Sequence, residues 1–319
     1  MEAKSTQTPA GKGRVLRLGT RGSVLAMAQS RWVAAELERC WPGIGVELRP
    51  VATSGDALGD RSLGEMGGKG LFTKELEQAL VAGELDVAVH SLKDVPVTMP
   101  LVAQEELVIE AIPRREDVRD VLVSLRARSL AQLPRGARVG TSSLRRRCQL
   151  LAARPDLRIE PLRGNIDTRL RRLREGQWDA VVVAMAGLRR SGLFDAGWMV
   201  PLEPQEMLPA PGQGALAVQC RREDQATRRL LAPLNDRETA VCVQAERRLV
   251  ELLQGDCRSP IAALAMEEGG MLSLIGAVGG RDGDPPVLKA RARAAEGEAA
   301  AMEVYGLLKQ QEAESSGRE

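Results

Sequence analysis

Segments with the patterns of strands and helices alternate along this chain in two successive stretches. Apolar or extended runs are followed by runs in which apolar residues recur at helical spacing. In the first stretch we predict strands at 15–19, 46–51 and 85–89 and helices at 23–37 and 73–82. In the second we predict strands at 138–140, 158–162 and 180–184 and helices at 142–153 and 166–175. This alternation is typical of α/β layers with mainly parallel sheets.

Two such lobes with a cleft between them are typical of periplasmic-binding-protein-like anion receptors. A chain of 319 residues is long enough for two or three domains. A loop at 208–218 leads to a strand that we expect to return to the first lobe. We therefore predict a first lobe from residues 1–113 and 209–232, a second from 114–208, and a smaller α+β C-terminal domain from 233–319. That domain is expected to hold helices at 238–253 and 296–310, strands near 272–278 and a frayed end at 312–319.

Composition argues against several classes of function. His90 is the only histidine, so a His-ligated metal site or a Ser-His-Asp triad would depend on that one residue, and we predict neither. The five cysteines contain no CxxC pair, so we expect no metal and no disulfide framework. Aromatic residues are only 2% of the chain, which argues against stacking of nucleobases.

Charge and hydropathy give further expectations about partners. The net charge of +2 provides no whole-molecule field for nucleic acid or membrane. Residues 1–13 lack the apolar run of a signal peptide, and no segment offers about 18 uninterrupted apolar residues. We therefore expect a cytoplasmic protein that binds neither a membrane nor nucleic acid.

Basic residues gather in the middle of the chain. Residues 135–190 contain 14 arginines, no lysine and five acidic residues, so the stretch carries 14 − 5 = +9. Guanidinium groups bind carboxylates through two parallel hydrogen bonds. We expect this stretch to meet an anion, unless neighbouring domains offset its charge.

Two glycine-containing segments of the first lobe are candidate anion sites. Residues 19–23 end a strand and open a helix, so backbone N–H groups, the Ser23 hydroxyl and the Arg21 side chain converge there. A plain helix N-cap with a surface arginine explains this segment equally well. Residues 67–72 place three glycines around Lys69 without forming a Walker motif, and taken alone they indicate only a surface loop.

Residues 90–96 follow a buried strand, at the carboxyl edge of the sheet where α/β folds place their ligands. Here Asp94 could stabilise a neighbouring cation, while Lys93 and Ser91 bind carboxylates. The alternative is a surface Lys–Asp pair worth about 0–1 kcal/mol.

Hydroxyl groups and arginines share the first turn of the helix predicted at 142–153. Positive charge there opposes the helix dipole and costs about 0.3–1 kcal/mol unless an anion neutralises it, which favours a binding role. The residues of the second lobe expected to bind anions are Thr141, Ser142, Ser143, Arg145, Arg146, Arg163, Gly164, Arg169 and Arg190. The arginines expected to be solvated helix surface are Arg147, Arg171, Arg172 and Arg174.

Cys257 lies in a loop between Gly255 and Pro260. Asp256 would raise the pKa of its thiol and Arg258 would lower it, so the neighbours do not decide its reactivity. Buried free cysteines are more often inert than reactive, and we expect the other four to be inert.

Together these motifs resemble those of the porphobilinogen deaminases, over roughly residues 15–264. The run Val-His-Ser-Leu-Lys-Asp-Val-Pro is specific to that family. Its members also carry a Gly-Gly-Cys-x-x-Pro loop whose cysteine holds a dipyrromethane by a thioether bond. The resemblance therefore implies that Cys257 is the attachment residue, with Asp256 in place of the second glycine. It also implies binding roles for Lys69, Phe72 and Gln213.

The reaction implied by the resemblance is the synthesis of hydroxymethylbilane, a transferase step of tetrapyrrole and haem biosynthesis. Four porphobilinogen molecules would lose ammonia and join head to tail on the dipyrromethane, and water would release the product. Asp94 would hydrogen-bond a pyrrole N–H and stabilise the azafulvene-like cation, with Lys93 beside it. Each porphobilinogen carries an acetate and a propionate, so Arg21, Ser23, Ser91 and the residues of the second lobe would bind carboxylates. We expect a monomer.

Two other functions remain open at this point. A two-lobed protein that binds a small anion without chemistry would explain the arginines, but it gives Asp94 and Cys257 no task. A nucleic-acid-binding protein could use the arginines of 163–174. The few aromatic residues and the nearly neutral total charge argue against it.

Overall fold

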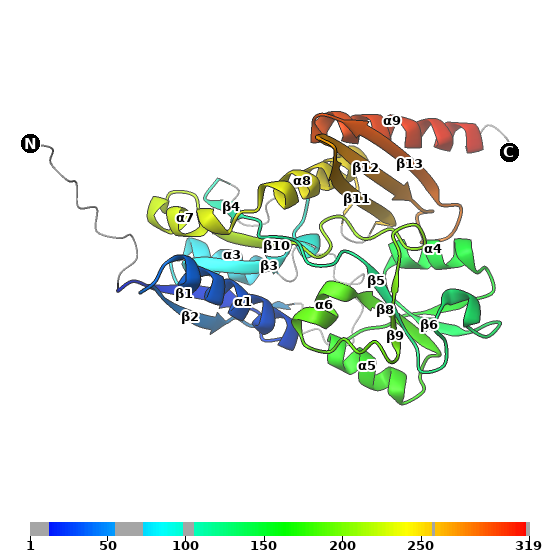
Figure 1. Cartoon of the computed structure of the whole chain (residues 1–319), viewed down its shortest axis with the longest axis horizontal. Coiled ribbons are helices and arrows are strands. Elements are labelled where there is room, and N and C mark those ends of the chain that lie inside the picture. Colours follow the sequence, from blue (N-terminus) through cyan, green and yellow to red (C-terminus); the bar gives the residue numbers. More distant parts are fainter. Residues whose placement is uncertain (1–12, 55–72, 98–104, 257–258, 317–319) are drawn as a thin grey trace, which may run out of the picture.

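The computed structural model describes residues 13–54, 73–97, 105–256 and 259–316. Within these residues the chain forms two α/β lobes and a third domain that contacts both of them (Figure 1). The predicted α/β class is confirmed, and one strand in each lobe's sheet runs antiparallel to the others.

The first lobe is built on a sheet with the order β2-β1-β3-β10-β4. Its helices α1 and α7 cover one face of the sheet, and α3 covers the other. Its elements are β1 (Val15–Thr20), α1 (Val24–Cys40), β2 (Gly45–Pro50), α3 (Lys74–Val81), β3 (Val87–Ser91), the 3-10 turn η1 (Leu92–Asp94), β4 (Leu107–Ala111), β10 (Leu216–Arg221), α7 (Gln225–Leu231) and η3 (Ala232–Leu234).

The second lobe also has a five-stranded sheet, with the order β7-β6-β8-β5-β9, and its antiparallel strand again lies second from one edge. Apolar strand residues face α4 on one side and α5 and α6 on the other. Its elements are β5 (Asp120–Val123), η2 (Leu130–Gln132), β6 (Arg138–Gly140), α4 (Leu144–Ala153), β7 (Arg158–Glu160), α5 (Ile166–Arg174), β8 (Ala180–Ala184), α6 (Met185–Arg190) and β9 (Met199–Leu202).

Two segments, 112–119 and 203–215, connect the lobes and touch each other. The Glu116 N–H donates to the Gly214 carbonyl at 3.2 Å. Gly214 has a φ of +88°, and a Cβ atom there would collide with the Glu116 carbonyl, so only glycine suits this crossing. The second segment leads into β10, which lies between β3 and β4 of the first sheet.

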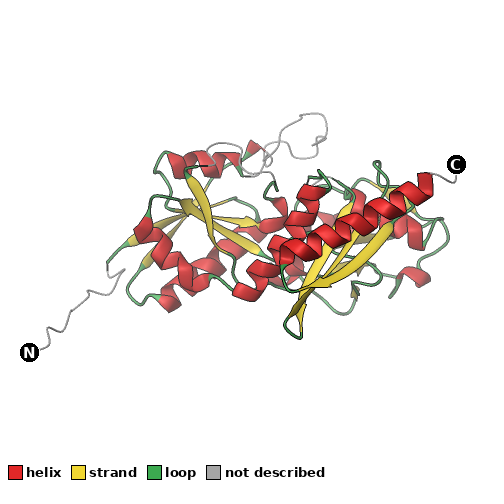
Figure 2. Ribbon diagram, turned by 90° about the horizontal axis from the view of Figure 1, so that it is seen from above, coloured by secondary structure: helices red, strands yellow, loops and turns green. Residues whose placement is uncertain are grey.

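The third domain packs two helices on one face of an antiparallel sheet with the order β11-β12-β13. In Figure 2 the helix that ends at the C-terminus lies along this sheet. Its elements are α8 (Arg237–Leu252), β11 (Ile261–Glu268), β12 (Met271–Val278), β13 (Leu288–Ala294) and α9 (Gly297–Ser316). The frayed end predicted from residue 312 is wrong as far as Ser316, because α9 continues to that residue, with 312–315 exposed to solvent.

A buried carboxylate on α8 ties the third domain to both connecting segments. Glu246 is fully buried and accepts hydrogen bonds from both terminal nitrogens of Arg115, at 2.7 and 3.0 Å. It also accepts from the Gly212 N–H at 2.7 Å and the Ala265 N–H at 2.9 Å. Because a buried carboxylate needs such partners, this contact fixes α8 against the crossing point.

Candidate active site

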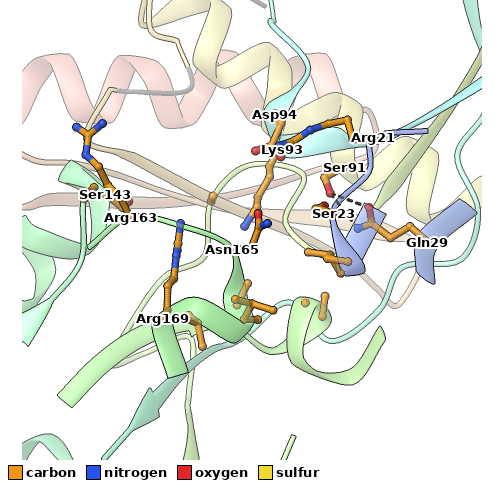
Figure 3. A pocket seen from close by; sticks show the side chains of 18 of the residues that line it. Arg21, Ser23, Gln29, Ser91, Lys93, Asp94, Ser143, Arg163, Asn165 and Arg169 are labelled. Carbon is orange, nitrogen blue, oxygen red and sulfur yellow. Dashed lines mark hydrogen bonds between the residues drawn. The ribbon is translucent and has the colours of Figure 1, made fainter. Parts of the chain in front are cut away.

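A cavity of about 1350 Å³ lies between the two lobes and is bordered by the third domain. Most of its polar residues follow the carboxyl ends of parallel strands, where open α/β sheets form their ligand sites. Figure 3 shows Lys93 of the first lobe and Arg169 of the second reaching into this space from opposite sides. The predicted site residues that line the cavity are Arg21, Ser23, Ser91, Lys93, Asp94, Thr141, Ser142, Ser143, Arg145, Arg146, Arg163, Gly164, Arg169 and Arg190.

On the first lobe, Arg21 and Ser23 follow β1. The Ser23 hydroxyl accepts a hydrogen bond from the Ala26 N–H at 3.2 Å, so it caps α1 at the cavity wall. The Gln29 side-chain amide on α1 donates to the Ser91 hydroxyl at 2.9 Å and orients it. Gln29 is itself buried and lines the cavity, and sequence reasoning missed it.

Lys93 and Asp94 occupy the 3-10 turn directly after β3. The Lys93 ammonium donates to the Gln213 side-chain oxygen at 3.3 Å. Burial lowers the pKa of Lys93 to about 8, although the charge of Asp94 opposes that effect. Gln213 was predicted to bind the ligand, but it is not among the residues that line the cavity, and its contacts place it behind Lys93.

Asp120, at the start of β5, organises the arginines of α4. Its carboxylate pairs with Arg145 at 2.8 Å and Arg146 at 2.7 Å, and it accepts from Gln213 at 3.0 Å. Burial alone would raise the pKa of Asp120, but the two guanidinium groups hold it well below its ordinary value. The anion that neutralises the first turn of α4 is therefore supplied by the protein itself, which the sequence argument did not foresee.

Several cations in the cavity keep unused binding capacity. Arg145 makes both of its side-chain hydrogen bonds with one terminal nitrogen, so its Nε and its other terminal nitrogen make none with the described residues. The hydrogen bonds of Arg169 and Arg190 go to backbone carbonyls, of Gly164 and Gly214 respectively. Burial lowers the pKa of each of these two arginines to about 10. Such groups are suited to binding carboxylates of a ligand.

The hydroxyl groups after β6 have local partners at the cavity wall. Thr141 accepts a hydrogen bond from the Ser143 N–H at 3.2 Å. The Ser142 hydroxyl bridges the carbonyl and N–H of Leu162, at 3.0 Å each. These contacts fix the loop between β6 and α4 against the end of β7.

Some sequence predictions need correction, and others cannot be placed. Arg172 was expected to be solvated surface, but it lines the cavity one turn after Arg169 on α5. Lys69, Phe72 and Cys257 lie outside the described residues. Asp256 and Ser259, on either side of the Cys257 position, are described and line the cavity.

Within the described residues, no helix is both long enough and apolar enough to cross a bilayer. The same residues contain no group of three or more His, Cys, Asp or Glu side chains placed to hold a metal ion.

Fold and cavity define a two-lobed α/β protein with a cationic cleft of the kind that holds a polyanion. Residues 16–229 match the family model described as porphobilinogen deaminase, dipyromethane cofactor binding domain, and residues 240–306 match the model of its C-terminal domain. The chain belongs to the porphobilinogen deaminase family, as its motifs had indicated.

Individual relatives match most of the chain. The porphobilinogen deaminase of Syntrophobacter fumaroxidans is 51% identical over 271 residues, covering 85% of this chain and 86% of that protein. That of Acidithiobacillus ferrooxidans is 50% identical over 293 residues, covering 92% and 94%. A periplasmic substrate-binding protein from Coxiella burnetii is similar over 70% of this chain and 94% of its own, with a TM-score of 0.42 and 17% identity. That last likeness is too distant to bear on function.

Proposed function

We propose that this chain synthesises hydroxymethylbilane from four porphobilinogen molecules, on a dipyrromethane joined to Cys257. Membership of the family supplies the reaction. The single structural observation that supports this assignment is a cavity lined by Asp94 and by the half-buried cations Lys93, Arg169 and Arg190, which are only partly engaged by the protein. The ligand gains two carboxylates with every added pyrrole, so it requires several cationic groups around the cavity.

The described residues fit a dipyrromethane, which carries four carboxylates. Nitrogens without a hydrogen bond to the described residues on Arg145, Arg169 and Arg190 offer cationic donors around one space. The loop that holds Cys257 borders the same space through Asp256 and Ser259. When bound, the group supplies the pyrrole end to which the first substrate is joined.

The remaining tasks belong to side chains of the protein. Asp94 accepts a hydrogen bond from the substrate pyrrole N–H and stabilises the positive charge that develops when ammonia leaves. Lys93, held by Gln213, binds a substrate carboxylate next to that point. Arg21, Ser23 and Ser91 bind carboxylates from the first lobe, and the arginines of the second lobe do so from the other side. Catalysis is then mostly positioning and electrostatic stabilisation.

Intact mass tests the covalent attachment. Protein made in cells should exceed its sequence mass by a two-pyrrole unit, and Cys257→Ser should not. Cys40→Ser, at a half-buried position away from the cavity, is the matched control and should keep the added mass. Wild-type protein without added mass would contradict the proposal and favour a receptor that binds an anion without chemistry.

The role of Asp94 has its own test. Asp94→Asn should keep the two-pyrrole mass and lose turnover of porphobilinogen by about 100-fold or more, because a neutral amide cannot stabilise the developing cation. Asp282→Asn, on an exposed loop of the third domain, is the control. Near-normal turnover in Asp94→Asn would remove the residue from this role.

The finer assignments are also proposals. The lobe limits 1–113 with 209–232, 114–208 and 233–319 are supported by the membership of each sheet. We propose a cytoplasmic monomer that acts on a small molecule and binds no nucleic acid. Light scattering during gel filtration tests the oligomeric state, and retention on DNA or RNA at low salt tests the last point.

A further inference from the structure

The turn that carries Asp94 has two buried and two half-buried side chains. Leu92 and Val95 are almost fully buried, at 1% and 3% exposure, whereas Lys93 and Asp94 are half-buried at the cavity wall. Within the turn, the Val95 N–H donates to the Leu92 carbonyl at 3.1 Å. No hydrogen bond from the described residues fixes the Asp94 carboxylate, so its position depends on how the turn is held.

The Leu92 N–H donates to the Ala215 carbonyl at 3.0 Å, and the third domain supplies further support for the turn. Leu92 and Val95 pack in one apolar cluster with Ala240 and Val243 of α8. Arg247 lies four residues after Val243, so it shares the same face of the helix. This face of α8 therefore follows the turn along its length.

Arg247 makes the polar part of the contact. One terminal nitrogen donates to the Val95 carbonyl at 2.9 Å and the other to the Pro96 carbonyl at 2.7 Å. The side chain lines the same cavity as Asp94. No carboxylate of the described residues forms an ion pair with it, whereas the adjacent Arg248 pairs with Glu251 and Glu298. Both terminal nitrogens of the Arg247 guanidinium group are therefore hydrogen-bonded to the backbone just after Asp94.

We propose that Arg247 is a positioning residue for Asp94. It holds the turn 92–96 in a fixed place relative to α8, the helix that ends five residues before Cys257. This contact then helps to keep the catalytic carboxylate and the attachment loop in register. This inference rests on the proposed function, because it takes Asp94 as the catalytic group.

Arg247→Leu and Arg247→Lys test this role in the full-length protein. Arg247→Leu should keep the two-pyrrole mass, while kcat for porphobilinogen falls about 10- to 100-fold and KM changes by less than about twofold. Hydrogen exchange at the Val95 amide should become faster, because the turn opens more often. Arg247→Lys keeps the charge but loses the two-point contact, so its kcat should lie between those of the wild type and Arg247→Leu. The matched controls, Arg248→Leu and Arg248→Lys, should leave kcat and Val95 exchange unchanged.

Other outcomes would overturn the inference. Unchanged kcat and unchanged Val95 exchange in both Arg247 variants would mean that the turn holds itself. A raised KM with normal kcat would make Arg247 a substrate-binding residue, and loss of the added mass would place it in cofactor assembly. If Arg247→Leu does not fold, the Arg247→Lys variant decides. Wild-type kcat and wild-type hydrogen exchange at the Val95 amide in Arg247→Lys would reject the positioning role. A wild-type protein that fails to consume porphobilinogen would instead contradict the proposed function.

Discussion

At the scale of single residues, the site consists of buried cations whose partners set what they can bind. Arg145 uses one terminal nitrogen for both Asp120 and the Leu208 carbonyl, so its other two side-chain nitrogens make no hydrogen bond with the described residues. Arg146 shares Asp120 but keeps one nitrogen without a partner. Since an isolated buried charge is costly, Asp120 makes it possible to hold both guanidinium groups in the cavity wall.

Lys93 gives a pH-dependent prediction at this scale. Burial lowers its pKa to about 8, so its ammonium form is lost as the pH rises through that value. If the ammonium binds a substrate carboxylate, kcat/KM should fall between about pH 7 and pH 9 as the charge disappears. Lys93→Arg, which stays charged, should abolish that fall, whereas the exposed Lys74→Arg should keep it. A flat kcat/KM profile in the wild type over this range would contradict the prediction.

Motif reading recovered the residues that follow strand ends but not those that support them. Lys93, Asp94 and Arg145 lie in compact runs whose chemistry is readable. Asp120 is one of three acidic residues within 116–120, with nothing to single it out, and Gln213 was expected to bind the ligand rather than to support Lys93. Their roles arise only when β5 and the 203–215 segment meet α4 and Lys93 in space.

At the scale of elements, helices were easier to predict than the strands of the third domain. The N-caps of α1 and α8, Ser23 and Asp236, mark helix starts within a residue or two of the prediction. Strand β11 is rich in alanine, which has weak strand preference, and it was missed. Strand β13 was also missed, although its alternation of basic and apolar residues was a usable signal.

The crossing of the two connecting segments predicts a glycine requirement. Gly214→Ala forces a side chain into a positive φ and against the Glu116 carbonyl, so it should lower the free energy of unfolding by well over about 1 kcal/mol. Gly176→Ala is the matched control, because its φ is +81° but nothing lies within 4 Å of the added carbon. Its cost should be close to about 1 kcal/mol. Equal losses for the two variants in urea titrations would show that the contact with Glu116 does not matter.

At the scale of the whole molecule, the cavity is a joint product of three domains. The lobes supply Asp94 and the arginines, and the third domain supplies Arg247 and the loop around Cys257. The repeated strand-helix order predicted two lobes, and the change of pattern near residue 236 predicted a separate third unit. The third domain contacts the Asp94 turn through one face of α8. Sequence periodicity predicts that this face is buried, but it does not predict which segment packs against it.

Glu246 should couple these domains. Glu246→Leu leaves Arg115 buried beside the crossing without its carboxylate, so it should lower the free energy of unfolding by about 3–5 kcal/mol. Unfolding monitored by intrinsic fluorescence and by far-UV circular dichroism should then separate into two transitions, because the third domain loosens first. Glu303→Gln, on the exposed side of α9, should change neither quantity. Coincident wild-type-like transitions in Glu246→Leu would show that other contacts hold the domains together.

The place of β10 in the first sheet has a consequence for how the protein is made. This strand lies between β3 and β4, yet the ribosome produces it only after all of the second lobe. During translation the second lobe can close its sheet as soon as residue 202 has emerged, while the N-terminal lobe must wait with a gap at its centre. The part of the protein that is synthesised first therefore finishes folding later.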